Sequence, residues 1–236
     1  FLFPFGLGML CAYYLVTKIL VGPHDSPGLL RQDSTGPHIF AFFFGLVLLS
    51  VREPWNLVVN PESKHYLLAA FGVIIILTYT SFNLESEGSS YLLIIGGALA
   101  LTAMLLPGVS GALVLLTLGQ YTAIASSFHD RELEPLFFLI LGGIIGLITF
   151  VPFMNYIISE YMDTTMALLA GLMCGSLITL WPWKESYDVE GLSPNLYPAQ
   201  VFENFTVTSL FLTFLFFVVG MLSSYGLKYF EAEKET

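Results

Sequence analysis

Charge is scarce in this sequence of 236 residues: Asp, Glu, Lys and Arg make up 11%, whereas hydrophobic residues make up 56%. Soluble domains carry about a quarter charged residues, so this composition excludes a soluble globular protein and indicates a membrane protein. Basic residues are the scarcer sign, with 8 Lys and Arg against 18 Asp and Glu. Nucleic-acid binding needs a basic face, so the formal net charge of −10 excludes a nucleic-acid partner.

Cysteine is nearly absent, and metal-ligand patterns are missing. The two cysteines, Cys11 and Cys174, fall in apolar runs, where we interpret them as small core residues. No carboxylate lies deep in an apolar run, and the histidines lie in loops or at the ends of runs. Their spacing is not that of a metal site: His24, His38, His65 and His129. We therefore expect no metal and no cofactor.

Long apolar runs dominate what the sequence does contain. They predict membrane spans within 1–17, 66–84, 135–159, 164–183 and 205–227, and a short apolar helix over 39–51. Glycine-rich faces at 142–146 and 171–175 predict close helix packing. We interpret 1–236 as one all-α, multi-pass membrane domain that begins inside an apolar segment and lacks its N-terminal part.

The uncharged run 88–128 is too long for one spanning helix, which needs about 20 residues. Proline and glycine interrupt it near the middle: Pro107, Gly108, Val109, Ser110 and Gly111. We expect a broken, re-entrant helical hairpin over 88–128. Non-helical backbone at membrane depth persists only when it is buried or lines a wet cavity. Free amides of the restarting helix, with the Ser110 hydroxyl, would suit a phosphate. The alternative is a tight turn between two ordinary spans.

An internal repeat links the two halves of the sequence. Residues 40–50, followed by Pro54-Trp55, match 166–176, followed by Pro182-Trp183, with Ala, Gly, Leu and Ser in register. The copies extend over about 1–56 and 135–184, and the last span, 205–227, follows them. A hairpin at 88–128 would make the repeat inverted, which is a common transporter plan. The repeat then predicts a counterpart of the broken motif upstream of residue 1; chance similarity between glycine-rich helices is the alternative.

The motif at 107–111, followed by Leu118-Gly119-Gln120-Tyr121, resembles the polyprenyl-phosphate translocase family of bacterial and archaeal membrane proteins. The likeness extends to 40–46 and 170–183 and covers most of 1–183. It implies translocation of a polyprenyl monophosphate, such as undecaprenyl phosphate, across the cytoplasmic membrane. That step recycles the lipid carrier of cell-envelope glycans. The lipid and the bilayer are then the partners.

We expect the substrate to be bound by the five residues of the motif and by three further residues: Pro107, Gly108, Val109, Ser110, Gly111, Gly119, Tyr121 and Lys18. The resemblance implies two such motifs, each followed by a span with a basic residue near its end. Lys18 fits that position in the first copy, whereas the second has the neutral Val151-Pro152-Phe153. The alternatives are a snorkelling lysine at Lys18 and an aromatic-belt residue at Tyr121.

A membrane enzyme, such as a lipid phosphatase or transferase, is the rival class. It would need an acid–base pair, a metal, or a nucleophile beside a base. Nothing in the sequence supplies a base for Ser110, so we expect a transporter and no enzyme. A small-ion pore lined by the broken helix is a third class. Glu160 and Asp163, in a short turn between spans, are expected to be solvated loop residues.

Overall fold

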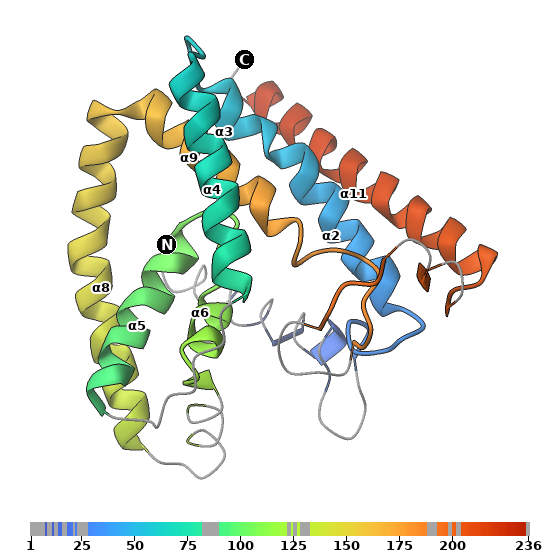
Figure 1. Cartoon of the computed structure of the whole chain (residues 1–236), viewed down its shortest axis with the longest axis horizontal. Coiled ribbons are helices and arrows are strands. Elements are labelled where there is room, and N and C mark those ends of the chain that lie inside the picture. Colours follow the sequence, from blue (N-terminus) through green and yellow to red (C-terminus); the bar gives the residue numbers. More distant parts are fainter. Residues whose placement is uncertain are drawn as a thin grey trace. The chain divides into compact units, whose positions relative to one another are not determined.

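Helices form the regular secondary structure of the chain in a computed structural model (Figure 1). The structure describes residues 8, 11, 14–15, 18–20, 22, 28–81, 90–121, 124, 127, 133–187, 193–197, 200–201 and 204–234. Within these ranges an isolated bridge between Lys184 and Asn195 is the only strand-like pairing. The all-α prediction is confirmed.

Eight helices are defined in the described part of the chain: α2 (Gly36–Ser50), α3 (Arg52–Asn56), α4 (Ser63–Ser81), α5 (Ser90–Leu105), α6 (Gly111–Thr117), α8 (Leu133–Glu160), α9 (Met162–Ser176) and α11 (Val207–Lys234). Within these described ranges, four stretches are long and apolar enough to cross a membrane: Gly36–Asn56, Ser63–Ser81, Leu133–Glu160 and Val207–Gly226. These stretches support the predicted multi-pass membrane fold.

Three predictions differ from the structure or fall outside it. The span predicted over 164–183 was wrong at its C-terminal end, because α9 stops at Ser176 and turns follow. After Ser176 the amides of Leu177, Ile178 and Thr179 donate to carbonyls three residues back, so the α-helical hydrogen-bond pattern ends there. Cys174 and Cys11 are exposed rather than in a core. Most of 1–17 lies outside the described residues, as do His24 and His129.

The chain divides into two compact units, residues 1–49 with 180–236 and residues 50–179. In the first unit α2 packs directly on α11. A Cβ at Gly45 would lie 2.2 Å from the carbonyl oxygen of Phe217, and one at Gly220 would lie 2.0 Å from that of Phe42. These two glycines therefore allow the helix backbones to touch.

The second unit contains two further helix pairs that depend on glycine. A Cβ at Gly171 of α9 would lie 2.1 Å from the Ala69 carbonyl oxygen of α4. A Cβ at Gly142 of α8 would lie 2.0 Å from the Ile94 carbonyl oxygen of α5. The close packing predicted from both glycine-rich faces is confirmed. Figure 1 shows α5 (green) beside α8 (yellow).

Candidate functional site

The chain reverses direction at the predicted motif. Helix α5 ends at Leu105, 106–110 are not helical, and α6 begins at Gly111. A Cβ at Gly111 would lie 2.5 Å from the Ala100 carbonyl oxygen, and the side chain of Gln120 donates to the Leu92 carbonyl over 2.7 Å. Helix α6 therefore runs back along α5, and the predicted break is present. Whether the hairpin is re-entrant in a membrane stays a prediction.

Glycine is required at the turn itself. Gly108 has φ +84°, a left-handed conformation that L side chains rarely adopt. A Cβ there would lie 2.8 Å from the Cα of Met173 on α9. The Val109 amide donates to the Leu106 carbonyl over 3.3 Å, which closes the turn around Pro107 and Gly108. Backbone conformation and close packing on α9 both exclude a larger residue.

Several hydrogen-bond donors lie close together where α6 begins. Ser110 is the N-cap, and its Oγ accepts from the Leu113 amide over 3.4 Å. Its own O–H donates to no described residue, and the amides of Gly111 and Ala112 have no acceptor among the described residues. Because α6 has only seven residues, these groups act as individual donors more than through a helix dipole.

Apolar side chains hold the turn in place within its unit. Val109 packs against a buried cluster formed by Ile76, Leu169 and Leu172, to which α4 and α9 contribute. It also packs against a second cluster, Ala100, Ala103 and Val114. Pro107, Gly108 and Ser110 remain at least partly exposed. One side of the non-helical backbone is therefore packed in protein, and the other is exposed, whereas Gly111 at the start of α6 is buried.

A cavity of about 560 Å³ lies beside the break, between α4, α5, α6 and α8. Its lining is mostly apolar: Leu99, Ala103, Leu106, Val114, Leu118 and Phe150. Thr102 and Thr117 also line it, but their hydroxyls donate to carbonyls of their own helices. The Tyr79 hydroxyl is buried near that of Thr117, and no described residue forms a hydrogen bond with it in good geometry.

The break lies beside the interior of α8 rather than beside its end. Helix α8 has 28 residues and is therefore about 42 Å long. Phe150, well inside α8, lines the same cavity as Leu106, the first residue of the break. The chain thus reverses level with the interior of a helix that is long enough to cross a bilayer.

The residues after α6 end the helix and fasten it. Gly119 has φ +67°, its amide donates to Leu116, and the Gln120 amide donates to Leu115, which together form a Schellman motif. The Gln120 side chain is 2% exposed and binds Leu92 of α5. The sequence places Gln120 in the family motif but gives no signal of this contact, because Leu92 is 28 residues away. Tyr121 is half-buried.

Lys18, the predicted cation of the site, is helical and exposed. Its ammonium lies 5.9 Å from the centroid of the Tyr14 ring. It belongs to the first unit and the break to the second, so its role at the phosphate stays a prediction.

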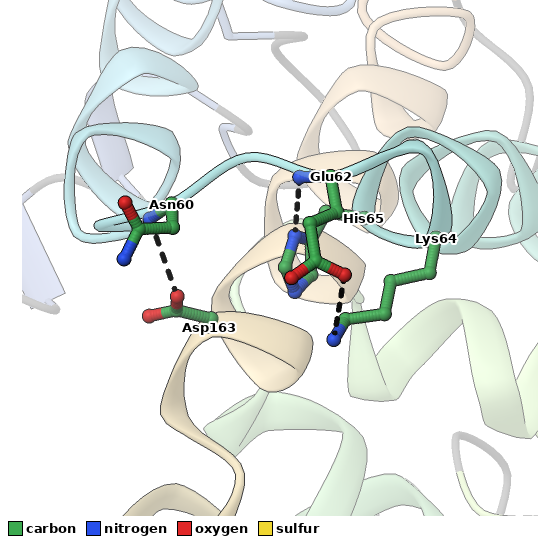
Figure 2. Close-up of polar contacts among 5 residues, drawn as sticks. All are labelled: Asn60, Glu62, Lys64, His65 and Asp163. Atoms are coloured by element: carbon green, nitrogen blue, oxygen red, sulfur yellow. Dashed lines mark hydrogen bonds and ion pairs between the residues drawn. The ribbon is translucent and has the colours of Figure 1, made fainter.

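Asp163 has a fixed structural role in the second unit (Figure 2). Its carboxylate accepts the amides of Val59 and Asn60 over 3.4 and 3.5 Å. The Nδ1 atom of His65 accepts the Glu62 amide over 3.0 Å in the same loop. These contacts tie the loop before α4 to the start of α9, so the prediction of a merely solvated Asp163 was incomplete. No group of potential metal ligands occurs among the described residues.

The helices that are long and apolar enough to cross a membrane define the class: a multi-pass helical membrane protein. A family model described as undecaprenyl phosphate translocase-like matches residues 1–193. The chain belongs to this undecaprenyl phosphate translocase-like family, which confirms the resemblance predicted from its motifs.

Two curated relatives carry the name polyprenyl-phosphate transporter. The protein from Vibrio cholerae serotype O1 is 33% identical over 207 residues, which cover 80% of this chain and 64% of the relative. The protein from Staphylococcus aureus is 26% identical over 259 residues, covering 100% of this chain and 80% of the relative. The chain thus spans less than two thirds of the Vibrio relative. No solved structure matches the chain.

Proposed function

We propose that this protein moves a polyprenyl monophosphate, such as undecaprenyl phosphate, across the cell membrane and so returns the lipid carrier for reuse. The observation that carries the proposal is the reversal at 107–111 beside an apolar cavity, in a chain of this family. The relatives' names, polyprenyl-phosphate transporter, support the same substrate class.

In this proposal the turn binds the phosphate headgroup of the lipid, and the cavity binds part of its tail. The phosphate would accept hydrogen bonds from the Ser110 hydroxyl and from the amides of Gly111 and Ala112. The first isoprene units would occupy the adjoining cavity of about 560 Å³. Pro107, Gly108 and Val109 would set the shape of the turn, while Gly119 and Tyr121 would define the far end of α6.

A phosphate monoester carries charge that hydrogen bonds from neutral groups compensate only in part. No cationic residue is among those lining this cavity. A lysine supplies a point charge that suits phosphate, and Lys18 is the residue we assign to this task.

We also propose that the protein catalyses no reaction on the lipid. Hydrolysis by Ser110 would require a base beside it. Of the two described histidines, His38 hydrogen-bonds Thr213 in the first unit, and His65 accepts the Glu62 amide. No acidic residue is among the described residues that line the cavity.

Transport in proteoliposomes tests the proposal. A fluorescent short-chain polyprenyl phosphate would be reconstituted with the protein, and its exchange between leaflets followed by quenching from outside. Ser110→Ala should slow exchange about 10-fold or more, because a donor to a charged group is lost. Ser159→Ala is the matched control, since that hydroxyl binds the Tyr156 carbonyl of its own helix. Unchanged exchange in Ser110→Ala, or a wild-type rate equal to that of empty liposomes, would overturn the proposal.

A further inference from the structure

Lys184 in the first unit is a buried lysine that forms no ion pair with the acidic residues that the structure describes. Only 6% of its surface is exposed. Its ammonium donates to the Asn195 side-chain oxygen over 3.2 Å and lies 5.1 Å from the centroid of the Phe40 ring. None of the described carboxylates lies within ion-pair distance of it. The ammonium carries three donors, and one of them is used by Asn195.

Lys184 lines a cavity of about 650 Å³. None of the described residues that line this cavity belongs to the broken hairpin at 88–128. Hydroxyl and amide side chains line the same cavity: Ser34, Asn204, Thr206 and Ser209. Hydroxyl and side-chain amide groups can donate hydrogen bonds to the oxygens of a phosphate, as backbone amides do. Two apolar side chains, Leu196 and Phe205, complete part of the wall.

The cavity lies where two long helices begin. Ser34 precedes the first residue of α2, and Ser209 is in the first turn of α11. These helices have 15 and 28 residues, and a helix N-terminus carries partial positive charge. In Figure 1 the blue start of α2 and the orange-red start of α11 lie at the same end of that pair. Both helix ends and Lys184 therefore favour negative charge in the same space.

The state of Lys184 agrees with an unfilled requirement for a counter-ion. Burial lowers the pKa of Lys184 to about 8. Tyr187 does not compensate the charge, since burial raises the pKa of its hydroxyl, which donates to the Pro182 carbonyl. Asp33 and Glu185 line the same cavity, but both side chains are exposed and therefore screened by solvent.

We propose that this cavity binds a phosphate anion, with Lys184 as its counter-ion. The ligand is either the headgroup of the lipid substrate or a free phosphate, because both present the same oxygens. Assigning the site to the lipid headgroup rests on the proposed function, in which it would be a second station for the substrate. The exposed carboxylates of Asp33 and Glu185 at the rim repel a doubly charged phosphate. They therefore lower the affinity of the cavity for phosphate and do not bind it.

Protection of the Lys184 amine from chemical labelling tests the site in the intact chain. The purified protein would be exposed at pH 8 to an amine acylating reagent, and labelling of each lysine measured by mass spectrometry. Three probes are compared: inorganic phosphate, a short-chain polyprenyl phosphate and the matching polyprenol. We expect a several-fold decrease at Lys184 with a phosphate-bearing probe and no decrease with the polyprenol. Lys64, an exposed lysine paired with Glu62, is the control.

Each outcome decides the proposal. Protection by both phosphate compounds assigns a general phosphate site, and protection by the lipid alone assigns a headgroup site. Protection by inorganic phosphate alone assigns a site for the free anion. Unchanged labelling with both phosphate compounds, or equal protection by the polyprenol, overturns the proposal. The same experiment on Ser110→Ala should give the same protection, so the two proposals can fail separately.

Calorimetry of phosphate binding to variants of the cavity gives a second test, in which the direction of each change in affinity is predicted. Lys184→Met should weaken binding at least 10-fold, and Lys184→Arg should retain most of it. Asp33→Asn should tighten binding several-fold, because it removes a like charge from the rim without altering Lys184. If Asp33→Asn weakens binding, the anion does not occupy this cavity.

Discussion

Gly108 shows how one residue determines the geometry of the candidate site. Its left-handed backbone and its contact with Met173 exclude a side chain for two independent reasons. Ser110, two residues later, starts α6 and presents its hydroxyl on the exposed side of the turn. The local chemistry of proline, glycine and serine is therefore sufficient to reverse the chain and leave donors open.

Gly108→Ala should destabilise the protein by about 2 kcal/mol or more, from backbone strain and overpacking against α9. Transport of polyprenyl phosphate should fall with it, because the turn cannot keep its shape. Thermal unfolding in detergent measures the first effect. Gly8→Ala is the control, since a Cβ at Gly8 meets nothing within 4 Å. Equal stability of the two variants would show that the turn does not depend on glycine.

Lys184 should make stability depend on pH. Burial lowers its pKa to about 8, whereas an exposed lysine titrates near 10.5. Between these values the unfolded chain binds the proton and the folded chain does not, so stability should rise with pH. Tyr187 acts oppositely above about pH 10, because its pKa is raised by burial.

The measurement for this prediction is the unfolding free energy in denaturant between pH 8 and 10. Wild type should become more stable across this interval, and Lys184→Met should lose the dependence. The same slope in both proteins would place the titrating group elsewhere.

Sequence reasoning recognised part of the residue-level picture. The break followed from Pro107 and Gly108, whose backbone preferences are local. The burial of Lys184 and Gln120 was not predictable, because it arises from partners distant in sequence: Phe40 for Lys184, and Leu92 for Gln120. A lysine at the start of a polar loop looks solvated until tertiary packing is known.

Pairs of helices in direct backbone contact are the elements that position the break. Helix α5 carries the break at its end and lies against α8 through Gly97, Gly142 and Gly146. Helix α6 is fastened to α5 by Gln120. The orientation of the donors at Ser110 therefore depends on contacts that lie along α5 and α8.

Gly142→Ala should separate α5 from α8, because its Cβ would lie 2.0 Å from the Ile94 carbonyl oxygen. Overpacking of this kind costs about 1–3 kcal/mol, so the melting temperature should fall and transport should decrease. Gly226→Ala on α11 is the matched control, as a Cβ at Gly226 would meet nothing within 4 Å. A Gly142→Ala variant with wild-type melting and transport would contradict the role of this contact.

The helices themselves were largely predictable, because apolar length and glycine spacing are visible in the sequence. The early end of α9 at Ser176 was not. The apolar run continues to Trp183, and the run alone does not reveal that the chain leaves the helix for turns. Hydropathy measures burial and lipid contact, whereas helix ends depend on local hydrogen bonding.

At the scale of the whole molecule, helix pairing supports the internal repeat. Helix α4, which follows the first copy, pairs with α9 of the second copy, whereas α11, which follows the second copy, pairs with α2 of the first. Each copy thus packs against the helix that follows the other. This reciprocal pairing is what a repeat with exchanged helices would give, and the inverted repeat stays a prediction.

The intact protein should release no inorganic phosphate from polyprenyl phosphate. The reason is the absence, among the described lining residues of the cavity, of any base or acid that could act with Ser110. A phosphate-release assay on purified protein, with a known phosphatase as positive control, measures this. Steady release above that of Ser110→Ala would place the protein among enzymes instead.

Photo-cross-linking tests most directly the claim that the break binds the lipid. A polyprenyl phosphate with a diazirine in the isoprene unit next to the phosphate would be illuminated with the protein in nanodiscs, and the labelled peptides mapped. The account predicts labels on the lining of the cavity in α5, α6 and α8, reduced by unlabelled polyprenyl phosphate but not by polyprenol. Labels spread over the exposed face of α11 and unaffected by either competitor would contradict it.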